Sequence, residues 1–110
     1  MILLESKKLE RFIRQNHEKP VVALFHAEWC VYCKKLLVLL EKSEKKDAFW
    51  VSVILNSFDD ETWEKYRIKT IPTIIIFYCG HEVHRREAKP GEGLREEDLA
   101  TVNLKLENLA

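Results

Sequence analysis

The 110-residue sequence has no long apolar segment and no excess of charge of one sign. No stretch approaches the roughly 18 consecutive apolar residues that a membrane-spanning helix needs. Residues 1–4 are apolar, but Glu5 ends that run far short of the about 7–15 apolar residues of a secretion signal. The 18 basic and 18 acidic residues give a formal net charge of +0, so no overall field attracts nucleic acid or an anionic membrane. We therefore expect a cytoplasmic protein with neither nucleic acid nor a membrane as its partner.

Cysteine, glycine and glutamine are also scarce. Three cysteines in an intracellular protein indicate redox or metal chemistry rather than a scaffold stapled by disulfides. Hydrophobic residues make up 46% of the chain, which is enough for a single domain over residues 1–110, and we expect a monomer. The three glycines, the single glutamine and the abundance of Glu and Lys favour a heat-adapted, thermophile source.

The hydrophobic pattern predicts strands and helices that alternate along the chain. Ser6 is the candidate N-cap of the first helix. Strand–helix–strand crossovers imply parallel pairing, and a tight turn at Cys79-Gly80 adds an antiparallel pair. The sequence thus predicts an α/β fold, a mixed central sheet flanked by helices in the order β-α-β-α-β-α-β-β-α. Strands are expected at residues 1–5, 21–27, 49–55, 70–78 and 81–88, and helices at 6–16, 30–46, 59–68 and 94–110.

Two cysteines, Cys30 and Cys33, lie three apart in the stretch "HAEWCVYCK" (26–34), where an apolar strand gives way to a helix. This spacing is found in redox-active dithiols and also in zinc sites. The motif by itself therefore leaves both chemistries open.

The sequence resembles the thioredoxin family. The segment "FHAEWCVYCK" (25–34) is followed about forty residues later by "YRIKTIPTIIIF" (66–77) and then by a glycine turn, and the similarity runs over essentially the whole chain. A tyrosine before the second cysteine also occurs in glutaredoxins and some disulfide isomerases. The resemblance implies a thioredoxin fold and a thioredoxin-like or glutaredoxin-like protein disulfide oxidoreductase.

The resemblance also implies roles for single residues. Cys30 is the attacking cysteine and Cys33 the resolving one, and together they form the redox-active disulfide. Pro72 is a cis-proline that faces them, and Ile71 offers its backbone to an extended substrate peptide. The family works without an organic cofactor or a metal, because the two cysteines carry the two electrons.

Elementary physical chemistry agrees with these roles. Cys30 is placed at a helix N-terminus, where free N–H groups and the helix dipole favour a thiolate. Cys33 is one turn further along the helix and shielded, so it can attack a mixed disulfide on Cys30. Trp29 is expected to line the groove beside Cys30, and Val31 and Tyr32 to form an exposed apolar rim that contacts substrate.

Four residues near the cysteines depart from the common thioredoxin pattern. Val31-Tyr32 replaces Gly-Pro between the cysteines, which leaves the reduction potential open. Leu24 stands where thioredoxins bury an aspartate, and His26 replaces a tryptophan on the same strand face as Leu24. Because its pKa is ordinarily near neutrality, His26 is a candidate proton relay for the resolving thiol. The alternative is a partly exposed histidine that only packs.

Two other classes of protein compete with the redox enzyme. A metal site built on Cys30, Cys33 and His26 lacks a fourth ligand, because Cys79 is expected about 23 Å along a strand from Pro72. A redox-silent interaction module would not need both cysteines. We predict a reductase of protein disulfides rather than an oxidase or isomerase. By family analogy, its other partner is a flavin-dependent thioredoxin reductase.

Overall fold

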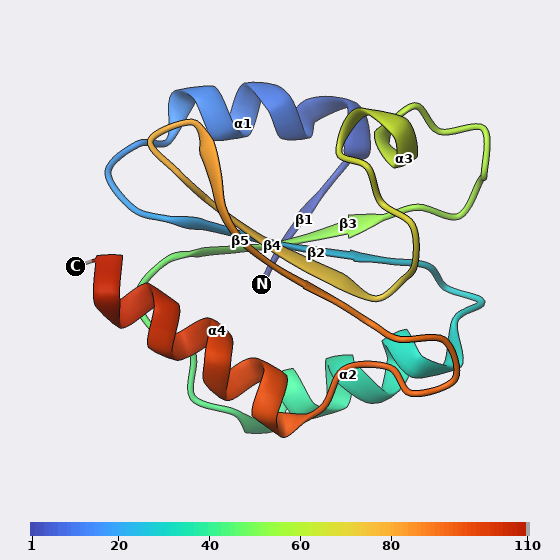
Figure 1. Ribbon diagram of the computed structural model, residues 1–110. Helices are drawn as coiled ribbons and strands as arrows, with labels where there is room; N and C mark the ends of the chain where they lie inside the picture. The colour runs from blue at the N-terminus through green and yellow to red at the C-terminus, as the bar shows by residue number, and fades with distance from the viewer. Residues whose placement is uncertain (110) are drawn as a thin grey trace.

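The computed structural model describes residues 1–109, which form one five-stranded sheet with helices on both faces. Figure 1 shows α1 and α3 over one face of the sheet and α2 and α4 over the other. No helix in this part of the chain is both long and apolar enough to cross a bilayer. The strands are β1 (Ile2–Leu4), β2 (Val21–His26), β3 (Phe49–Ile54), β4 (Thr73–Tyr78) and β5 (His81–Glu87). The helices are α1 (Leu9–Gln15), which follows the 3-10 turn η1 (Ser6–Lys8), α2 (Val31–Lys42), α3 (Thr62–Lys65) and α4 (Glu96–Leu109).

The order of the elements is the predicted one, and the strands lie in the order β1-β3-β2-β4-β5. β3 pairs in parallel with both β1 and β2, whereas β4 pairs antiparallel with β2 and β5. The predicted mixed sheet of an α/β fold is therefore confirmed.

The core has two halves, one on each face of the sheet, and the central strand β2 contributes side chains to both. All six of its residues are buried, because helices cover both faces of the sheet. Successive side chains alternate, so Val22 and Leu24 pack in the cluster under α2 and α4, and Phe25 packs in the cluster on the α1 side. His26 follows the same alternation and shares the α2 face with Leu24. The end of β2 leads within a few residues to the start of α2, which places both cysteines at that edge of the sheet.

Two local predictions were wrong. Ser6 does not cap α1: it begins η1, and its hydroxyl donates to Asp60 Oδ2 at 2.6 Å, a partner 54 residues away. The helix predicted over 30–46 ends at Lys42, and the next residue, Ser43, is extended. The carbonyl of Leu40 accepts the backbone N–H of Ser43 at 3.3 Å and also the ammonium of Lys45 at 2.6 Å, and these bonds close the helix C-terminus.

Candidate functional site

Cys30 and Cys33 form a disulfide at the N-terminus of α2, with their Cα atoms 5.2 Å apart. Cys30 is the N-cap: its backbone is extended, and its sulfur accepts the backbone N–H of Cys33 at 3.2 Å. The same N–H would stabilise negative charge on Cys30 in the reduced protein, together with the helix dipole. The site therefore favours a thiolate at Cys30.

The two cysteines differ in solvent exposure. Cys30 retains 7% of its surface, whereas Cys33 is fully buried. Both pack in a small cluster with Ala27 and the half-buried Ile71. A substrate disulfide can approach Cys30 from outside, while Cys33 is placed to react only with Cys30.

Ile71 and Pro72 lie directly across from the disulfide, on the segment that enters β4. The Ile71–Pro72 peptide bond is cis, the form that the resemblance implied. The carbonyl oxygen of Ile71 is 4.0 Å from Cys30 Sγ, and Pro72 is buried behind it. A peptide that pairs with the Ile71 backbone would therefore carry its own sulfur close to Cys30.

The residues expected to contact substrate adjoin Cys30 in the chain. Trp29 and Val31 are exposed, and Tyr32 is partly so. Tyr32 also has a role that sequence reasoning missed: its hydroxyl donates to the carbonyl of Gly91 at 2.8 Å. Its ring lies so close to Gly93 that a Cβ there would be 2.9 Å from Tyr32 Cδ1. The dipeptide between the cysteines thus holds the β5–α4 loop against the site.

Asn56, which sequence reasoning also missed, holds in place the two residues that precede Cys30. Its side-chain oxygen accepts the backbone N–H of Glu28 at 2.8 Å, and its amide donates to Glu28 Oε1 at 2.6 Å. Its backbone carbonyl accepts the indole N–H of Trp29 at 3.2 Å. No motif links residues 28 positions apart in this way, so no pattern in the sequence indicated the contact.

Leu24 and His26 are both buried beneath the α2 side of the sheet. His26 retains only 5% of its surface, so the expectation of a partly exposed packing histidine was wrong. Its Nε2 shares a buried hydrogen bond with Ser52 Oγ. Burial lowers the pKa of His26 below its ordinary value, and the nearby Glu28 carboxylate opposes this in part. Within residues 1–109, no hydrogen bond joins His26 to either cysteine, and the proton relay stays a prediction.

Replacing His26 with phenylalanine is expected to flatten the pH dependence of stability. The unfolded chain takes up a proton on His26 as the pH falls through about 6.5, but the folded protein does not, because its His26 pKa is lower. His26 therefore lowers the free energy of unfolding as the medium becomes acidic. Urea unfolding between about pH 5 and pH 8 measures the slope.

The same variant leaves the buried Ser52 hydroxyl without its partner, which is expected to cost about 1–3 kcal/mol at pH 8. The matched control is His26→Phe combined with Ser52→Ala, which removes both partners and should recover part of that loss. If the free energy of unfolding depends on pH in both variants as it does in the wild type, His26 does not titrate differently in the folded protein.

The His26→Phe variant also tests the proton relay. If its rate of mixed-disulfide resolution has the same pH profile as that of the wild type, the relay is excluded.

Cys79 lies far from this site. It occupies the β4–β5 turn with φ at +51°, is exposed, and has no disulfide partner. Pro72 precedes the opposite end of β4, so Cys79 can complete neither a metal site nor a second disulfide with the pair. In the described part of the chain, no group of three or more His, Cys, Asp or Glu side chains is arranged to hold a metal ion.

Known proteins resemble this chain in sequence and in fold. The family model described as Thioredoxin matches residues 1–101. Rice (Oryza sativa subsp. japonica) "Thioredoxin Y, chloroplastic" is 32% identical over 77 residues, which is 66% of this chain and 45% of that protein. Mouse (Mus musculus) "Thioredoxin, mitochondrial" is 34% identical over 92 residues, 82% of this chain and 52% of that protein. The chain thus spans about half the length of these curated relatives.

One further relative and two solved structures are also similar to this chain. The "Bifunctional thioredoxin reductase/thioredoxin" of Mycobacterium leprae is 31% identical over 89 residues, 79% of this chain and 19% of that protein. The crystal structure of the reduced Schistosoma mansoni thioredoxin pre-protein has a TM-score of 0.77 at 33% identity and covers 96% of each chain. The Fasciola hepatica thioredoxin structure also has a TM-score of 0.77, at 25% identity, over 96% of this chain and 99% of that one. The predicted thioredoxin fold is thereby confirmed.

Proposed function

The chain belongs to the thioredoxin family, and on that premise we propose that it is a protein-disulfide oxidoreductase that reduces disulfides through Cys30 and Cys33. One observation carries the proposal. The two cysteines form a disulfide at the N-terminus of α2, and Cys30 Sγ faces the Ile71 carbonyl at 4.0 Å. This arrangement brings together a stabilised sulfur nucleophile, a second thiol in reach and a backbone edge for a peptide.

The reaction proceeds in two exchanges. In the reduced protein, the Cys30 thiolate attacks one sulfur of the substrate disulfide; a mixed disulfide forms, and the other substrate sulfur leaves as a thiolate that takes a proton from water. The Cys33 thiol then loses its proton and attacks Cys30 Sγ, and the second substrate sulfur leaves. Two electrons have passed to the substrate, and the protein holds the Cys30–Cys33 disulfide.

The burial of the cysteines supports this order of events. Cys30 has the remaining exposure and accepts the Cys33 N–H, so it is the sulfur that meets substrate first. Cys33 is buried, so it does not meet substrate directly, and it is in reach of Cys30 for the second exchange. Leu24, which is buried and apolar, offers no carboxylate for the Cys33 proton.

The proposed direction of electron flow is reduction, in the cytoplasm, with oxidase or isomerase activity as the alternative. The thioredoxin-like Ile71 before Pro72 favours reduction. Electrons would come from a flavin-dependent reductase, a partner suggested by the M. leprae relative, whose name joins a thioredoxin reductase and a thioredoxin. The dipeptide Val31-Tyr32, between the cysteines, is the feature that leaves the reduction potential open. About 30 mV corresponds to a tenfold change in the equilibrium constant of the exchange, so a small local change decides the direction.

Equilibration against glutathione mixtures tests the direction. When the reduced protein is placed in a mixture poised at about −220 mV, we expect the Cys30–Cys33 pair to become a disulfide, because a reductant of protein disulfides has a more negative potential than this pool. Acid quenching, alkylation and mass measurement give the oxidised fraction. A pair that is fully reduced at this poise would favour the oxidase or isomerase. Failure to exchange with glutathione at all would favour the redox-silent module.

A further inference from the structure

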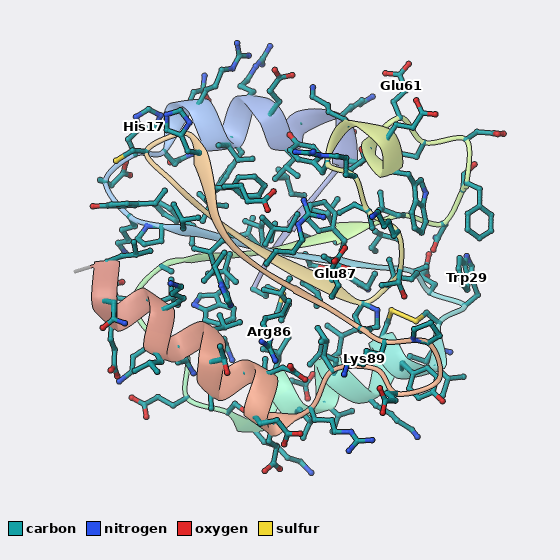
Figure 2. All side chains as sticks on the ribbon, in the orientation of Figure 1. His17, Trp29, Glu61, Arg86, Glu87 and Lys89 are labelled. Carbon is teal, nitrogen blue, oxygen red and sulfur yellow. A yellow bond between two sulfur atoms is a disulfide. The ribbon has the colours of Figure 1, made fainter. Side chains whose placement is uncertain are left out.

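Three aromatic rings stand in a row beside the disulfide. Phe58, in the loop between β3 and α3, lies between two indoles: its ring centroid is 5.5 Å from that of Trp29 and 5.4 Å from that of Trp63. We call these three residues the aromatic shelf. Trp29 directly precedes Cys30, and in Figure 2 its indole projects next to the yellow disulfide bond.

The shelf is held in place by the loop that carries it. The indole N–H of Trp29 donates to the carbonyl of Asn56 at 3.2 Å, and that of Trp63 donates to the carbonyl of Ser57 at 2.9 Å. These are successive carbonyls, and Phe58 follows them. Both indoles are therefore anchored before any partner arrives, so little conformational entropy remains to be lost on binding.

The shelf is far more exposed than packing requires. Phe58 leaves 75% of its surface in solvent, and Trp29 leaves 53%. Neither ring belongs to the two large core clusters, and only Trp63 packs against one of them. Exposed aromatic groups that adjoin one another are typical of contact surfaces, where they supply large area at low entropic cost.

Exposed acidic residues flank the shelf residues in the sequence. Glu28 and Glu64 adjoin Trp29 and Trp63 in the sequence, and Asp59 follows Phe58; all three carboxylates are exposed, as is Glu61. None of the four forms a salt bridge to any of residues 1–109. This negative charge is unneutralised, and it favours a cationic partner, as do aromatic faces that can bind an ammonium or guanidinium group.

We propose that the aromatic shelf is a specificity subsite for disulfide substrates whose cysteine is flanked, within about three residues, by a large apolar side chain and a Lys or Arg. The inference rests on the proposed function, since a substrate that exchanges with Cys30 next to the Ile71 carbonyl is what brings such a polypeptide to the shelf. Each extended residue advances about 3.3 Å, so a chain whose cysteine reaches Cys30 has its near neighbours over Trp29 and Phe58. The ring row receives the apolar side chain, and the acidic border receives the cation.

Three disulfide-linked peptides test the subsite. One carries Lys and Phe beside the cysteine, the second carries Lys and Ser, and the third carries Glu and Phe. Stopped-flow mixing of each with the dithiothreitol-reduced, desalted protein, in a Cys79→Ser background, gives a second-order rate constant for single turnover. We expect the Lys–Phe peptide to react about 2- to 12-fold faster than the other two. The Phe58→Ala variant should lose the preference for Phe over Ser.

Matched variants test the aromatic part and the acidic part of the subsite separately. Leu104→Ala removes another exposed apolar side chain, on α4, and should keep the wild-type preferences. Asp59→Asn with Glu61→Gln should lose the preference for Lys over Glu, and added salt should weaken that preference in the wild type. Equal rate constants for the three peptides, or a Phe58→Ala variant with wild-type preferences, would overturn the subsite. A dimer that Phe58→Ala dissolves, without any peptide preference, would assign the shelf to a second copy of the chain.

A small disulfide separates failure of the subsite from failure of the proposed function. 2-Hydroxyethyl disulfide has no side chain to place on the shelf, so the wild-type protein should reduce it whether or not the subsite exists. If the protein reduces 2-hydroxyethyl disulfide but reacts with the three peptides at equal rate constants, the subsite is wrong and the proposed function stands. If neither it nor any peptide is reduced, the proposed function falls, and the subsite with it.

Discussion

Replacing Cys30 with serine is expected to reduce turnover of protein disulfides to the rate measured without protein. The first exchange needs a thiolate, and Cys30 is the sulfur that is both reachable and placed at the N-terminus of α2. Cys33 is fully buried and has no such route to a substrate. Cys33→Ser should instead retain the first exchange and stall at the mixed disulfide, because no second thiol is in reach. A dithiothreitol-driven assay with a protein disulfide measures turnover.

The two variants control for each other, because both remove one sulfur from the same turn and leave the fold otherwise unchanged. Both are made with Cys79→Ser, so that a single thiol remains and the exposed Cys79 cannot form disulfide-linked dimers. Appreciable turnover by Cys30→Ser, or complete turnover by Cys33→Ser, would mean that the roles are assigned to the wrong residues.

Replacing Leu24 with aspartate is expected to have opposite effects on stability and on one chemical step. Leu24 is buried in the core cluster with Leu36, which lies one turn along α2 from Cys33. An unpaired carboxylate there should lower the free energy of unfolding by about 3–5 kcal/mol. The same carboxylate would accept the Cys33 proton and speed resolution of the mixed disulfide near neutral pH. Urea unfolding and quenched-flow kinetics measure the two effects.

The destabilisation should itself depend on pH. Burial raises the pKa of a carboxyl group, so the folded variant binds a proton over a range where its unfolded chain does not. The loss of stability relative to the wild type is therefore smallest below about pH 4 and grows as the pH rises through the folded-state pKa. Leu24→Asn, which is of similar size and polar but is no base, is the matched control. If it resolves the mixed disulfide as fast as Leu24→Asp, proton acceptance is not what limits the wild type.

The fold could be predicted because its signals are local. The apolar run of β2 and the periodic stripe of α2 each specify an element from neighbouring residues, and short connections then limit the topology. Cys30, Cys33 and Pro72 could be placed because their motifs lie at the ends of such elements. One expectation that failed depended on a distant partner. Ser6 binds Asp60 instead of capping a helix, and that competition is invisible in the local sequence.

The features of the site that sequence reasoning missed are contacts that loops make with distant segments. Asn56 holds Glu28 and Trp29, and Tyr32 holds the Gly91 carbonyl 59 residues away. Loops have no hydrophobic period, so their mutual register is set only once the sheet has brought them together. The same holds for Phe58, whose neighbours in the shelf come from two other segments.

A peptide map of the covalent complex that Cys33→Ser forms with a protein disulfide identifies the attacking sulfur most directly. We expect this sulfur to be that of Cys30. Digestion without reduction, followed by mass spectrometry, identifies which cysteine is joined to the substrate. We expect one cross-linked peptide, which joins Cys30 to a substrate cysteine, and no such product with Cys30→Ser. Capture of the substrate by Cys33 in the Cys30→Ser variant, with no cross-link through Cys30 in Cys33→Ser, would assign the attack to Cys33 instead.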